Sequence, residues 1–396
     1  MPIVNYIEKM MGMQDVEVKK IEEEEKRITI YIEMYRKDCE CPVCGRKTRR
    51  VHDYRWQRVK ELPAFGNDVE LRIHKRRYAC DCGKHFYEPC QFLGKYQRRT
   101  RRTTMTMIER LSDVRSYTKV AEEFKVSVPT VMRIFENISY PKPTTLPEAV
   151  GIDEFKGNTG GEKYNCILTD VGKKQVLDIM KSRKQADLCE YFKKIDRSGV
   201  KYFVSDMYVP YAEIAKTYFP KATYVIDKYH WIRQAIWAFE NVRKEVQKKF
   251  SKGYRIYFKH SRNLLLKREE KLTQDELDRV HVMLSTSSDL STAYFLKELL
   301  YKLLNTEDPD TQKCKLSEWI DAALDSDIKP FKRCAVTYQK WFSPIVNSFY
   351  CPYTNAYTEG FNNKIKVLKR NAFGLRNFRR FRNRILFCAS AKRAPR

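Results

Sequence analysis

The stretch of sequence that decides the fold begins with Val150-Gly-Ile-Asp153 and continues to Tyr202-Phe-Val-Ser-Asp206. Its first part holds three short apolar runs, at 150–153, 164–169 and 175–180, which are separated by turns that contain glycine. Runs of this length between glycine turns are typical of neighbouring antiparallel strands. We therefore predict a β-meander at the start of this stretch.

Helices and strands alternate after the predicted meander. A helical pattern at 184–194 is followed by the strand-like run that ends at Asp206, by a helical pattern at 210–218 and by a buried strand at 222–226. Strands that alternate with helices are typical of an α/β sheet. Residues 146–240 are therefore interpreted as the first part of an α/β domain.

The sequence after Lys228 is helical and highly charged up to about Phe342. It contains no strand signal comparable with those of the preceding stretch. We interpret residues 241–345 as an all-helical insertion, which would separate the first part of the α/β domain from a second part at 346–396.

The region before the meander divides into two smaller parts. Strand-like runs at 16–21 and 28–35 alternate with turns and cysteines, whereas the pattern from 97 to 138 is helical. The prolines at 141, 143 and 147 then form a stiff connector that no helix can cross, which predicts a domain boundary. The predicted domains are a β-rich zinc-binding domain at 1–95, a helix-turn-helix at 96–145, and the three parts at 146–240, 241–345 and 346–396.

The charge of the chain indicates a polyanionic partner. Lys and Arg number 77 against 50 Asp and Glu, a formal charge of +27, and such a field attracts nucleic acid through release of counterions. An anionic membrane is the rival, but no apolar run of about 18 residues is present. The N-terminus also lacks the basic-then-apolar order of a signal peptide. We expect a cytosolic protein whose first candidate partner is nucleic acid.

Six of the twelve cysteines fall between Cys39 and Cys90, and in a cytosolic chain such a cluster is more often a metal site than a disulfide scaffold. The pairs Cys41-Pro-Val-Cys44-Gly and Cys80-Asp-Cys82-Gly supply four thiols, which suit a structural, tetrahedral zinc ion. The other candidate ligands are Cys39, His52, His85 and Cys90. A reduced cluster without metal is the alternative.

Residues 117–135 have the pattern of a helix-turn-helix. The small residue Ala121 falls where two helices would cross, and Ser127 is a candidate N-cap of the second helix. That helix would present Pro129, Thr130 and Arg133 outward. Four arginines that would neutralise DNA phosphates precede it, namely Arg98, Arg99, Arg101 and Arg102. A plain helical hairpin between domains is the alternative.

Two aspartates stand at strand positions where a charge is costly. Asp153 lies within an apolar strand and Asp206 ends another, and each loses solvation unless a cation is near. Two such carboxylates can share a divalent cation such as Mg²⁺. Glu359, at a helix start rich in amides, is the candidate third ligand. Taken singly, each is more often a strand-end or helix-capping residue.

Four blocks carry a family resemblance: Gly151-Ile-Asp-Glu154, Ser205-Asp-Met-Tyr208, Val225-Ile-Asp-Lys-Tyr-His230 and Thr358-Glu-Gly-Phe-Asn-Asn-Lys-Ile-Lys366. Together with the cysteine pairs and the helix-turn-helix, they resemble the ISL-three family of bacterial insertion-sequence transposases. In that family the catalytic domain is ribonuclease H-like, and the three acidic residues of a DDE triad bind Mg²⁺ or Mn²⁺. The resemblance implies that Asp153, Asp206 and Glu359 are this triad.

The same resemblance implies further roles. The partner would be double-stranded DNA, in a nucleoid-associated protein. The zinc and helix-turn-helix modules would recognise the terminal repeats of the element, and a homodimer would join two ends. Asp227 and His230 resemble a D-x-x-H element of related transposases and would lie just outside the metal ligands; a capping Asp followed by a packed His is the alternative. A non-catalytic DNA-binding regulator and a nuclease that only hydrolyses DNA are the alternative functions.

The sequence after Glu359 contains twelve Lys or Arg and no acidic residue, interleaved with phenylalanines. This spacing predicts a helix whose aromatic side packs on the sheet while its cations face a DNA backbone. The predicted DNA-binding residues are Lys364, Lys366, Lys369, Arg370, Arg376, Arg379 and Arg380, together with Arg382 and Arg384. Trp231 and Trp237 are open to stacking on unpaired bases, although aromatic residues at helical spacing more often form a core.

Overall fold

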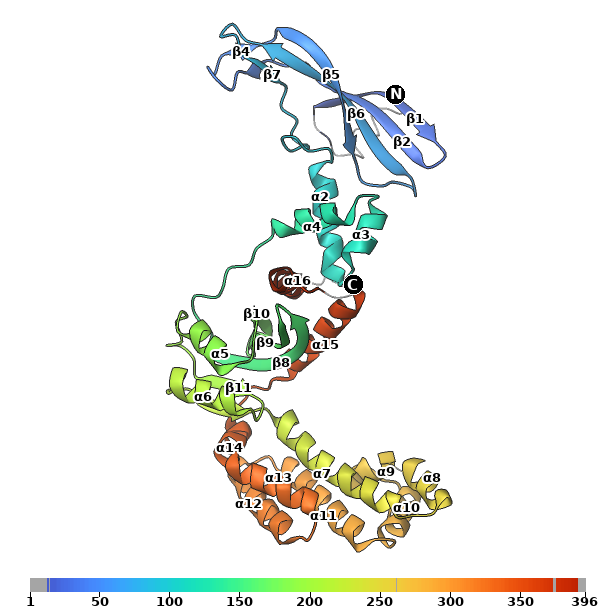
Figure 1. Cartoon of the computed structure of the whole chain (residues 1–396), viewed down its shortest axis with the longest axis vertical. Coiled ribbons are helices and arrows are strands. Elements are labelled where there is room, and N and C mark those ends of the chain that lie inside the picture. The colour runs from blue at the N-terminus through green and yellow to red at the C-terminus, as the bar shows by residue number, and fades with distance from the viewer. Residues whose placement is uncertain (1–12, 14, 261, 373–374, 391–396) are drawn as a thin grey trace. The chain divides into compact units, whose positions relative to one another are not determined.

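The computed structural model describes residues 13, 15–260, 262–372 and 375–390. The chain divides into two compact units, which are considered separately below (Figure 1). The first comprises Met1–Ser139 with Val367–Gly374, and the second comprises Tyr140–Lys366 with Leu375–Arg396. The five domain limits predicted from the sequence are finer than this division and stay predictions.

The first unit contains a five-stranded sheet in which the strand order is β1-β2-β6-β5 and β7 pairs with β6. Its strands are β1 (Val16–Glu24), β2 (Arg27–Met34), β5 (Val51–Lys60), β6 (Asp68–Ala79) and β7 (His85–Tyr87). A separate pair, β3 (Cys39–Glu40) and β4 (Lys47–Thr48), lies in the cysteine-rich segment. The region before residue 95 is therefore rich in β-structure, as its sequence predicts.

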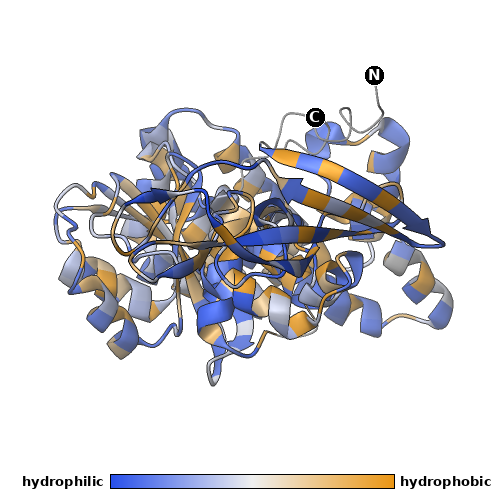
Figure 2. Ribbon diagram, turned by 90° about the horizontal axis from the view of Figure 1, so that it is seen from above, coloured by the Kyte–Doolittle hydropathy of each residue, from blue (hydrophilic) through white to orange (hydrophobic). Residues whose placement is uncertain are grey.

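Alternating polar and apolar residues give this sheet one buried face, and the alternation is visible as bands of colour along the strands in Figure 2. Leu71 and Ile73 of β6 are fully buried and pack with Ile30 and Ile32 of β2. Successive side chains of a strand point to opposite faces, so the residues between them are on the exposed face. Because that face carries many charged and aromatic residues, no apolar run marks β5 or β6 in the sequence.

Three helices follow in the first unit: α2 (Arg101–Arg110), α3 (Tyr117–Glu123) and α4 (Val128–Glu136), with the 3-10 turn η1 (Leu111–Asp113) after α2. Ala121 is buried as predicted, and the rings of Tyr117 and Phe135 join α3 to α4 with their centroids 6.0 Å apart. Ser127 occupies the N-cap position of α4, but its hydroxyl bonds to the Thr130 hydroxyl at 2.9 Å rather than to a backbone N–H. The predicted pair of helices is therefore formed.

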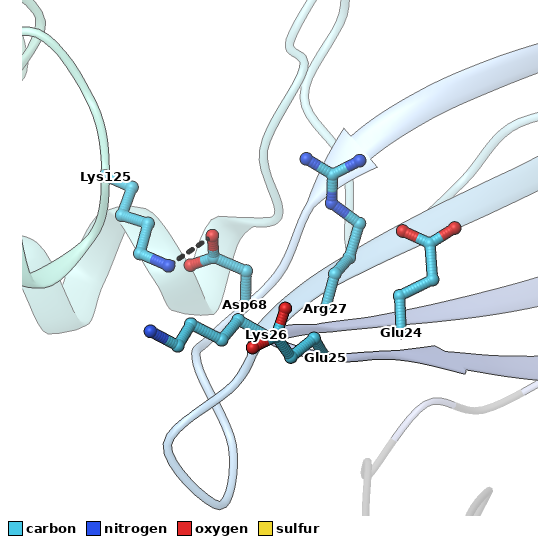
Figure 3. A pocket seen from close by; sticks show the side chains of 6 residues that line it. All are labelled: Glu24, Glu25, Lys26, Arg27, Asp68 and Lys125. Carbon is cyan, nitrogen blue, oxygen red and sulfur yellow. Dashed lines mark ion pairs between the residues drawn. The ribbon is translucent and has the colours of Figure 1, made fainter.

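An open, charged pocket lies where the turn between β1 and β2 approaches the turn between α3 and α4 (Figure 3). Its lining residues are Glu24, Glu25, Lys26, Arg27, Asp68 and Lys125. Lys125 Nζ is 2.8 Å from Asp68 Oδ2, and Lys60 Nζ donates to the carbonyls of Phe124 and Lys125 at 2.9 and 2.6 Å. These contacts join the sheet to the helices. Acidic and basic side chains are equal in number around the pocket, so it does not favour a charged ligand.

The second unit is built on a five-stranded sheet with the order β10-β9-β8-β11-β12. Its strands are β8 (Ala149–Thr159), β9 (Glu162–Asp170), β10 (Gln175–Met180), β11 (Tyr202–Ser205) and β12 (Thr223–Ile226). The first three form the predicted antiparallel meander, whereas β11 runs parallel to β8 and to β12. Helices α5 (Gln185–Phe192) and α6 (Val209–Tyr218) connect the later strands.

Helices cover both faces of this sheet (Figure 1). Val150 and Phe203 belong to the core on the side of α5 and α6. The other face carries α15 (Ala356–Asn371) and α16 (Phe378–Ser390), and Phe155 of β8 meets Phe381 of α16 with ring centroids 6.0 Å apart. Because side chains alternate along β8, Gly151 and Asp153 point toward the face that carries α15 and α16.

The stretch between β12 and α15 is helical throughout the residues that the structure describes there. Its helices are α7 (Lys228–Lys248), α8 (Lys252–His260), α9 (Arg262–Leu266), α10 (Gln274–Leu284), α11 (Ser288–Leu304), α12 (Pro309–Asp325), α13 (Lys329–Lys340) and α14 (Phe342–Tyr350), with the 3-10 turn η2 (Glu269–Lys271). They share one core, in which Trp231, Phe239, Trp319 and Tyr338 are almost completely buried. The strongly helical pattern of the sequence after Lys228 is thus confirmed.

Gly151 allows the residue before α15 to approach β8 closely. A Cβ atom at this position would lie 2.6 Å from Asn355 Oδ1, 2.6 Å from Val171 Cγ1 and 2.7 Å from Thr169 Oγ1. Real Cβ atoms do not approach heavy atoms this closely, so any larger residue would push Asn355 away from the sheet.

We therefore expect Gly151→Ala to lower the melting temperature of the protein, because overpacking of this kind costs roughly 1–3 kcal/mol. The matched control is Gly253→Ala, since Gly253 lies in α8 with no heavy atom within 4 Å of an added Cβ and alanine is the better helix former. Thermal melts would contradict the expectation if both variants melted at the temperature of the wild type or above it.

Candidate functional site

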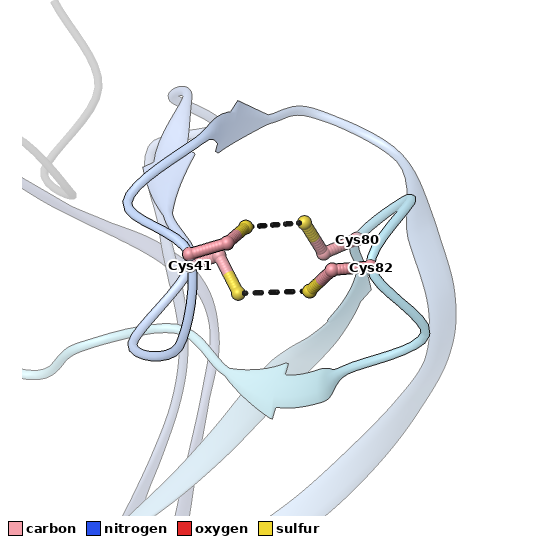
Figure 4. Close-up of side chains that lie close together, drawn as sticks. Cys41, Cys80 and Cys82 are labelled. Carbon is pink, nitrogen blue, oxygen red and sulfur yellow. Dashed lines mark hydrogen bonds between the residues drawn. The ribbon is translucent and has the colours of Figure 1, made fainter.

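The four predicted zinc ligands come together in the first unit (Figure 4). Cys41 Sγ lies 3.6 Å from Cys82 Sγ, and Cys44 Sγ lies 3.5 Å from Cys80 Sγ. A tetrahedron with Zn–S bonds of about 2.3 Å has edges of about 3.8 Å, so the sulfurs already have nearly the spacing of a zinc site. Among the described residues, these four form the only group of three or more Cys, His, Asp or Glu whose ligand atoms all lie within 4.8 Å of one another.

The two turns are built to hold thiolates. Gly45 and Gly83, the glycines that follow the two pairs, have φ angles of +71° and +82°, which other residues adopt only with strain. The backbone N–H of Cys44 donates to Cys41 and lowers the pKa of its thiol to about 6. The other candidate ligands, Cys90 included, lie outside the cluster. The thiol of Cys39 donates to a backbone carbonyl, and the rings of His52 and His85 contact each other at a tilt of 39°.

The helix-turn-helix presents its predicted residues on α4. Pro129 and Arg133 are exposed and Thr130 is half-buried, and the Arg133 guanidinium lies 3.4 Å from the Thr130 hydroxyl. Arg99 is close enough to Arg133 for the two charges to interact: burial lowers the pKa of Arg99, and the charge of Arg133 lowers it further. The Nε of Arg99 is buried without a hydrogen-bond partner. Two cations that act on each other favour a nearby anion such as a phosphate.

The other predicted arginines differ in exposure. Arg98 and Arg101 are exposed at the start of α2. Arg102 instead forms an ion pair of 2.8 Å with Glu61, a carboxylate that is 98% buried. Arg102 therefore has a structural partner, and a DNA contact by any of the three stays a prediction.

Three aspartates follow one another across the sheet of the second unit. β11 pairs with β8 so that Val204 is opposite Gly151, and two residues further along each chain come Asp206 and Asp153. The register between β11 and β12 likewise sets Asp227 beside Asp206. Because neighbouring strands lie about 4.8 Å apart, the sheet brings the three carboxylates into one row, which we call the aspartate row.

Helix α15 is fastened to both ends of the aspartate row. The side-chain amide of Asn362 donates to Asp153 Oδ2 at 2.8 Å, and the backbone N–H of Asn355 donates to Asp227 Oδ1 at 2.9 Å. These asparagines are seven residues apart, which is two helical turns, so they lie on the same side of the helix. The sequence marks this helix start as rich in amides but does not identify which amides contact the aspartates.

Burial makes the ionised forms of Asp153 and Asp206 unfavourable. It raises the pKa of Asp153 to about 6, although the backbone N–H of Glu154 and the imidazole of His230 act in the opposite direction. It raises the pKa of Asp206 to about 7, and the negative charges of Asp153 and Glu154 add to this rise. These two carboxylates are therefore stabilised either by protons or by a bound cation.

Glu359 is half-buried in the first turn of α15. It follows Thr358, whose hydroxyl lies 2.7 Å from that of Thr169 on β9, and it precedes Asn362 by three residues. Helix α15 thus holds Glu359 on the side of the sheet that carries Asp153. The ligand atoms of the three predicted carboxylates are nevertheless not all within 4.8 Å of one another, whereas the sulfurs of the four cysteines are.

A fourth carboxylate beside the row is already neutralised. Glu154 accepts from Arg183 Nη1 at 2.6 Å with both carboxylate oxygens. The guanidinium of Arg183 lies over the rings of Tyr164 and Tyr208, with 4.2 and 5.1 Å to the centroids. The Glu154 carboxylate is therefore engaged by Arg183 and is not available to a metal ion. The sequence alone does not distinguish Glu154 from Asp153, because this ion pair is seen only in the structure.

The predicted basic face of the C-terminal helices is only partly exposed. Lys366, Arg370, Arg376 and Arg379 are exposed, and Lys364, Lys369 and Arg380 are half-buried. The prediction that Arg382 and Arg384 face DNA is wrong: Arg382 pairs with the buried Asp178 at 2.6 Å, and Arg384 is 1% exposed. Arg382 is therefore held by β10 of the sheet, and Arg384 is buried. The two tryptophans also differ, since Trp231 is buried and Trp237 is 54% exposed.

Comparison with known proteins agrees with this arrangement. Three family models match in chain order: the zinc-finger of transposases IS204/IS1001/IS1096/IS1165 at residues 26–83, the helix-turn-helix domain of transposase family ISL3 at 88–139, and the ISL3 transposase domain at 150–385. The chain is 27% identical over 387 residues to the transposase of insertion sequence element IS1001 from Bordetella parapertussis, covering 94% of each protein. A second match, 48% identical to an ATP-dependent protease of Lactococcus lactis, covers only 13% of this chain and 16% of that protein.

A zinc ribbon, a helix-turn-helix and a transposase domain in this order define a DNA-binding transposase. The chain belongs to the ISL3 family of transposases. Its four cysteines provide the structural zinc site of the ribbon. None of the helices in the described part of the chain is both apolar enough and long enough to cross a bilayer.

We expect Cys44→Ser to abolish zinc binding and to destabilise the first unit, because three thiolates and a hydroxyl hold zinc far more weakly than four thiolates. Metal analysis of the purified protein should find one zinc per wild-type chain. Cys314→Ser is the matched control, since Cys314 is an exposed cysteine on α12 and its variant should keep the metal. Retention of a full equivalent of zinc by Cys44→Ser would contradict the assignment.

Proposed function

We propose that this transposase cleaves and joins DNA phosphodiesters at a site formed by Asp153, Asp206 and Glu359, with divalent metal ions as cofactor. The observation that carries the proposal is the aspartate row, in which two carboxylates with raised pKa values lie on neighbouring strands beneath the helix that bears Glu359. A buried concentration of negative charge has little structural benefit, and it is what a divalent cation requires.

The sheet supports a ribonuclease H-like catalytic domain. Three antiparallel strands followed by two parallel strands, with helices on both faces, agree with the fold that the family resemblance implies. We further propose that the helices α7–α14 are an insertion into this domain, because the strands and α15 on either side of them meet at the aspartate row.

The side chains around the row fit Mg²⁺ or Mn²⁺. Asp206 Oδ1, Asn355 Oδ1 and Asn362 Oδ1 are buried oxygens without a hydrogen-bond partner, and hard divalent cations prefer carboxylate and amide oxygens. Asp153 and Asp206 would hold the metal from the sheet and Glu359 from α15. Divalent ions held by these residues would supply Lewis-acid chemistry, which activates a water or 3′-hydroxyl and offsets the negative charge of the phosphoryl group.

The residues of the chain then position the reaction. Asn362 holds one oxygen of Asp153 at 2.8 Å and leaves the other oxygen to the backbone N–H of Glu154 at 2.7 Å, so the orientation of this carboxylate is fixed. Asp227 is engaged by the backbone of Asn355, and we assign it to anchoring α15 rather than to binding the metal. His230, whose charge acts on Asp153, is placed to stabilise the ionised row.

The first unit would supply recognition of the DNA. We propose that the exposed residues of α4 and the arginines before α2 contact the terminal repeats of the element, and that two copies of the chain bring two ends together. Arg99 and Arg133, whose charges act on each other and which form no ion pair with a carboxylate among the described residues, are the strongest candidates for a phosphate contact in this unit. A regulator without catalysis is not favoured, because burial of the aspartate row costs free energy and a regulator would gain no function from it.

We expect Asp153→Asn, Asp206→Asn and Glu359→Gln each to reduce Mg²⁺-dependent cleavage by roughly 10²-fold or more, with little change in DNA affinity. The assay uses a duplex that carries an end of the element with its flanking DNA, and resolves both nicked strands and strand-transfer products. Glu213→Gln, which changes an exposed carboxylate on α6, is the control and should cleave normally. Full cleavage by Glu359→Gln would remove this residue from the proposed site.

The raised pKa of Asp206 gives a second expectation that does not depend on activity. A carboxyl whose pKa rises from 3.8 to about 7 on folding destabilises the fold progressively as the pH rises from about 4 to about 7, by up to about 4 kcal/mol. In a chelator at pH 8, Asp206→Asn should therefore melt above the wild type, and this difference should shrink toward pH 4.

Addition of Mg²⁺ at pH 8 should reverse that order. Binding to the folded state raises the melting temperature of the wild type, whereas Asp206→Asn should gain little. Melting curves that respond equally to Mg²⁺ in both proteins would indicate that the metal binds elsewhere.

A further inference from the structure

Helix α7 carries an exposed row of two aromatic rings with an arginine between them. We call Tyr229, Arg233 and Trp237 the α7 ladder. The guanidinium carbon of Arg233 lies 5.5 Å from the centroid of the Tyr229 ring and 4.3 Å from that of Trp237. Because its members are four residues apart, the ladder follows one face of the helix.

The ladder is not needed for packing. The opposite face of α7 enters the helical core through Trp231, Ala235 and Phe239, which are at most 2% exposed. Tyr229 and Trp237 remain 43% and 54% exposed. In the described part of the chain no carboxylate forms an ion pair with Arg233, so its charge is available to a ligand.

The ladder begins beside the aspartate row. Tyr229 is two residues from Asp227, and its ring centroid lies 5.6 Å from that of His230, the residue whose charge acts on Asp153. Helix α7 begins two residues after β12 ends, and Figure 1 shows it running away from the sheet into the helical part of the chain. At a rise of about 1.5 Å per residue, the ladder extends over about 12 Å, a length that matches about three to four stacked bases.

We propose that the α7 ladder binds unpaired nucleotides of the DNA strand that is being cut. A base within a duplex is stacked on both faces, so exposed rings can stack only on a base that has left its pair. Arg233 adds a cation for the phosphate and a planar surface for a base. This inference rests on the proposed function, because that function brings a DNA strand to the aspartate row.

The charge of the molecule favours this occupant over a protein partner. The chain carries a formal charge of +27, and the exposed face of α7 continues beyond Trp237 with Asn241 and Lys244 rather than with apolar residues. A stacking surface beside cations is typical of proteins that bind single strands, whereas an interface between two copies would bring like charges together.

The test measures binding alone, in a chelator, with full-length protein that carries Asp206→Asn so that no strand is cut. The probes are a fluorescent 30-nucleotide single strand of mixed sequence and a blunt duplex of the same sequence. We expect Trp237→Ala to weaken single-strand binding by roughly 5- to 100-fold and duplex binding by less than about 2-fold. Trp237→Phe should restore most of the affinity, and the single strand should quench the fluorescence of Trp237.

Phe295→Ala is the control, because it removes another exposed aromatic side chain, on α11, and should leave both affinities unchanged. Equal loss of single-strand and duplex binding in Trp237→Ala, or no loss of either, would overturn the proposal. A changed state of self-association without a change in DNA affinity, measured by sedimentation, would show that the ladder contacts a second copy instead. Failure here would leave the carboxylate site intact, since its test depends on cleavage.

Discussion

Three aspartates in register on neighbouring strands repel one another and lose most of their hydration, and the second unit is organised around this electrostatic constraint. The amide of Asn362 and the backbone of Asn355 hold the outer two carboxylates, whereas Oδ1 of Asp206 is left without a partner. These hydrogen bonds, and that from the backbone N–H of Glu154 to Asp153, leave Asp206 uncompensated. Burial raises the pKa of Asp206 to about 7, so this carboxyl gains from a proton or from a bound cation at neutral pH.

Much of this arrangement follows from sequence patterns alone. Asp153 and Asp206 stand out because a charge interrupts or ends an apolar run, and the two cysteine pairs stand out through their spacing and glycines. Asn355 and Asn362 do not stand out, because asparagine is common at a helix start. Only the packing of α15 on the sheet shows that these two residues contact the aspartates. The sequence wrongly predicts that Arg382 and Arg384 face DNA, for a related reason. In a segment without acidic neighbours, the partner of Arg382 lies 204 residues away at Asp178, where local sequence gives no sign of it.

The two units stabilise themselves by different means. The first has a thin sheet with one apolar face, and four sulfurs within 4.8 Å of one another tie its cysteine-rich turns together. The second has a sheet covered by helices on both faces and a separate helical core rich in tryptophan and tyrosine. Metal coordination thus substitutes for hydrophobic burial where the chain has few apolar residues to bury. The aspartate row is the converse case, in which a large hydrophobic core stabilises a domain that contains energetically unfavourable buried carboxylates.

The order of these parts along the chain has a biological consequence. The zinc ribbon and the helix-turn-helix lie within residues 26–139, whereas Asn355 and Asn362, which contact the aspartate row, are translated more than 200 residues later. A nascent chain therefore has its DNA-binding modules before it has helix α15. A fragment that stops before α15 would keep the modules that bind DNA without the residues that hold Asp153 and Asp227.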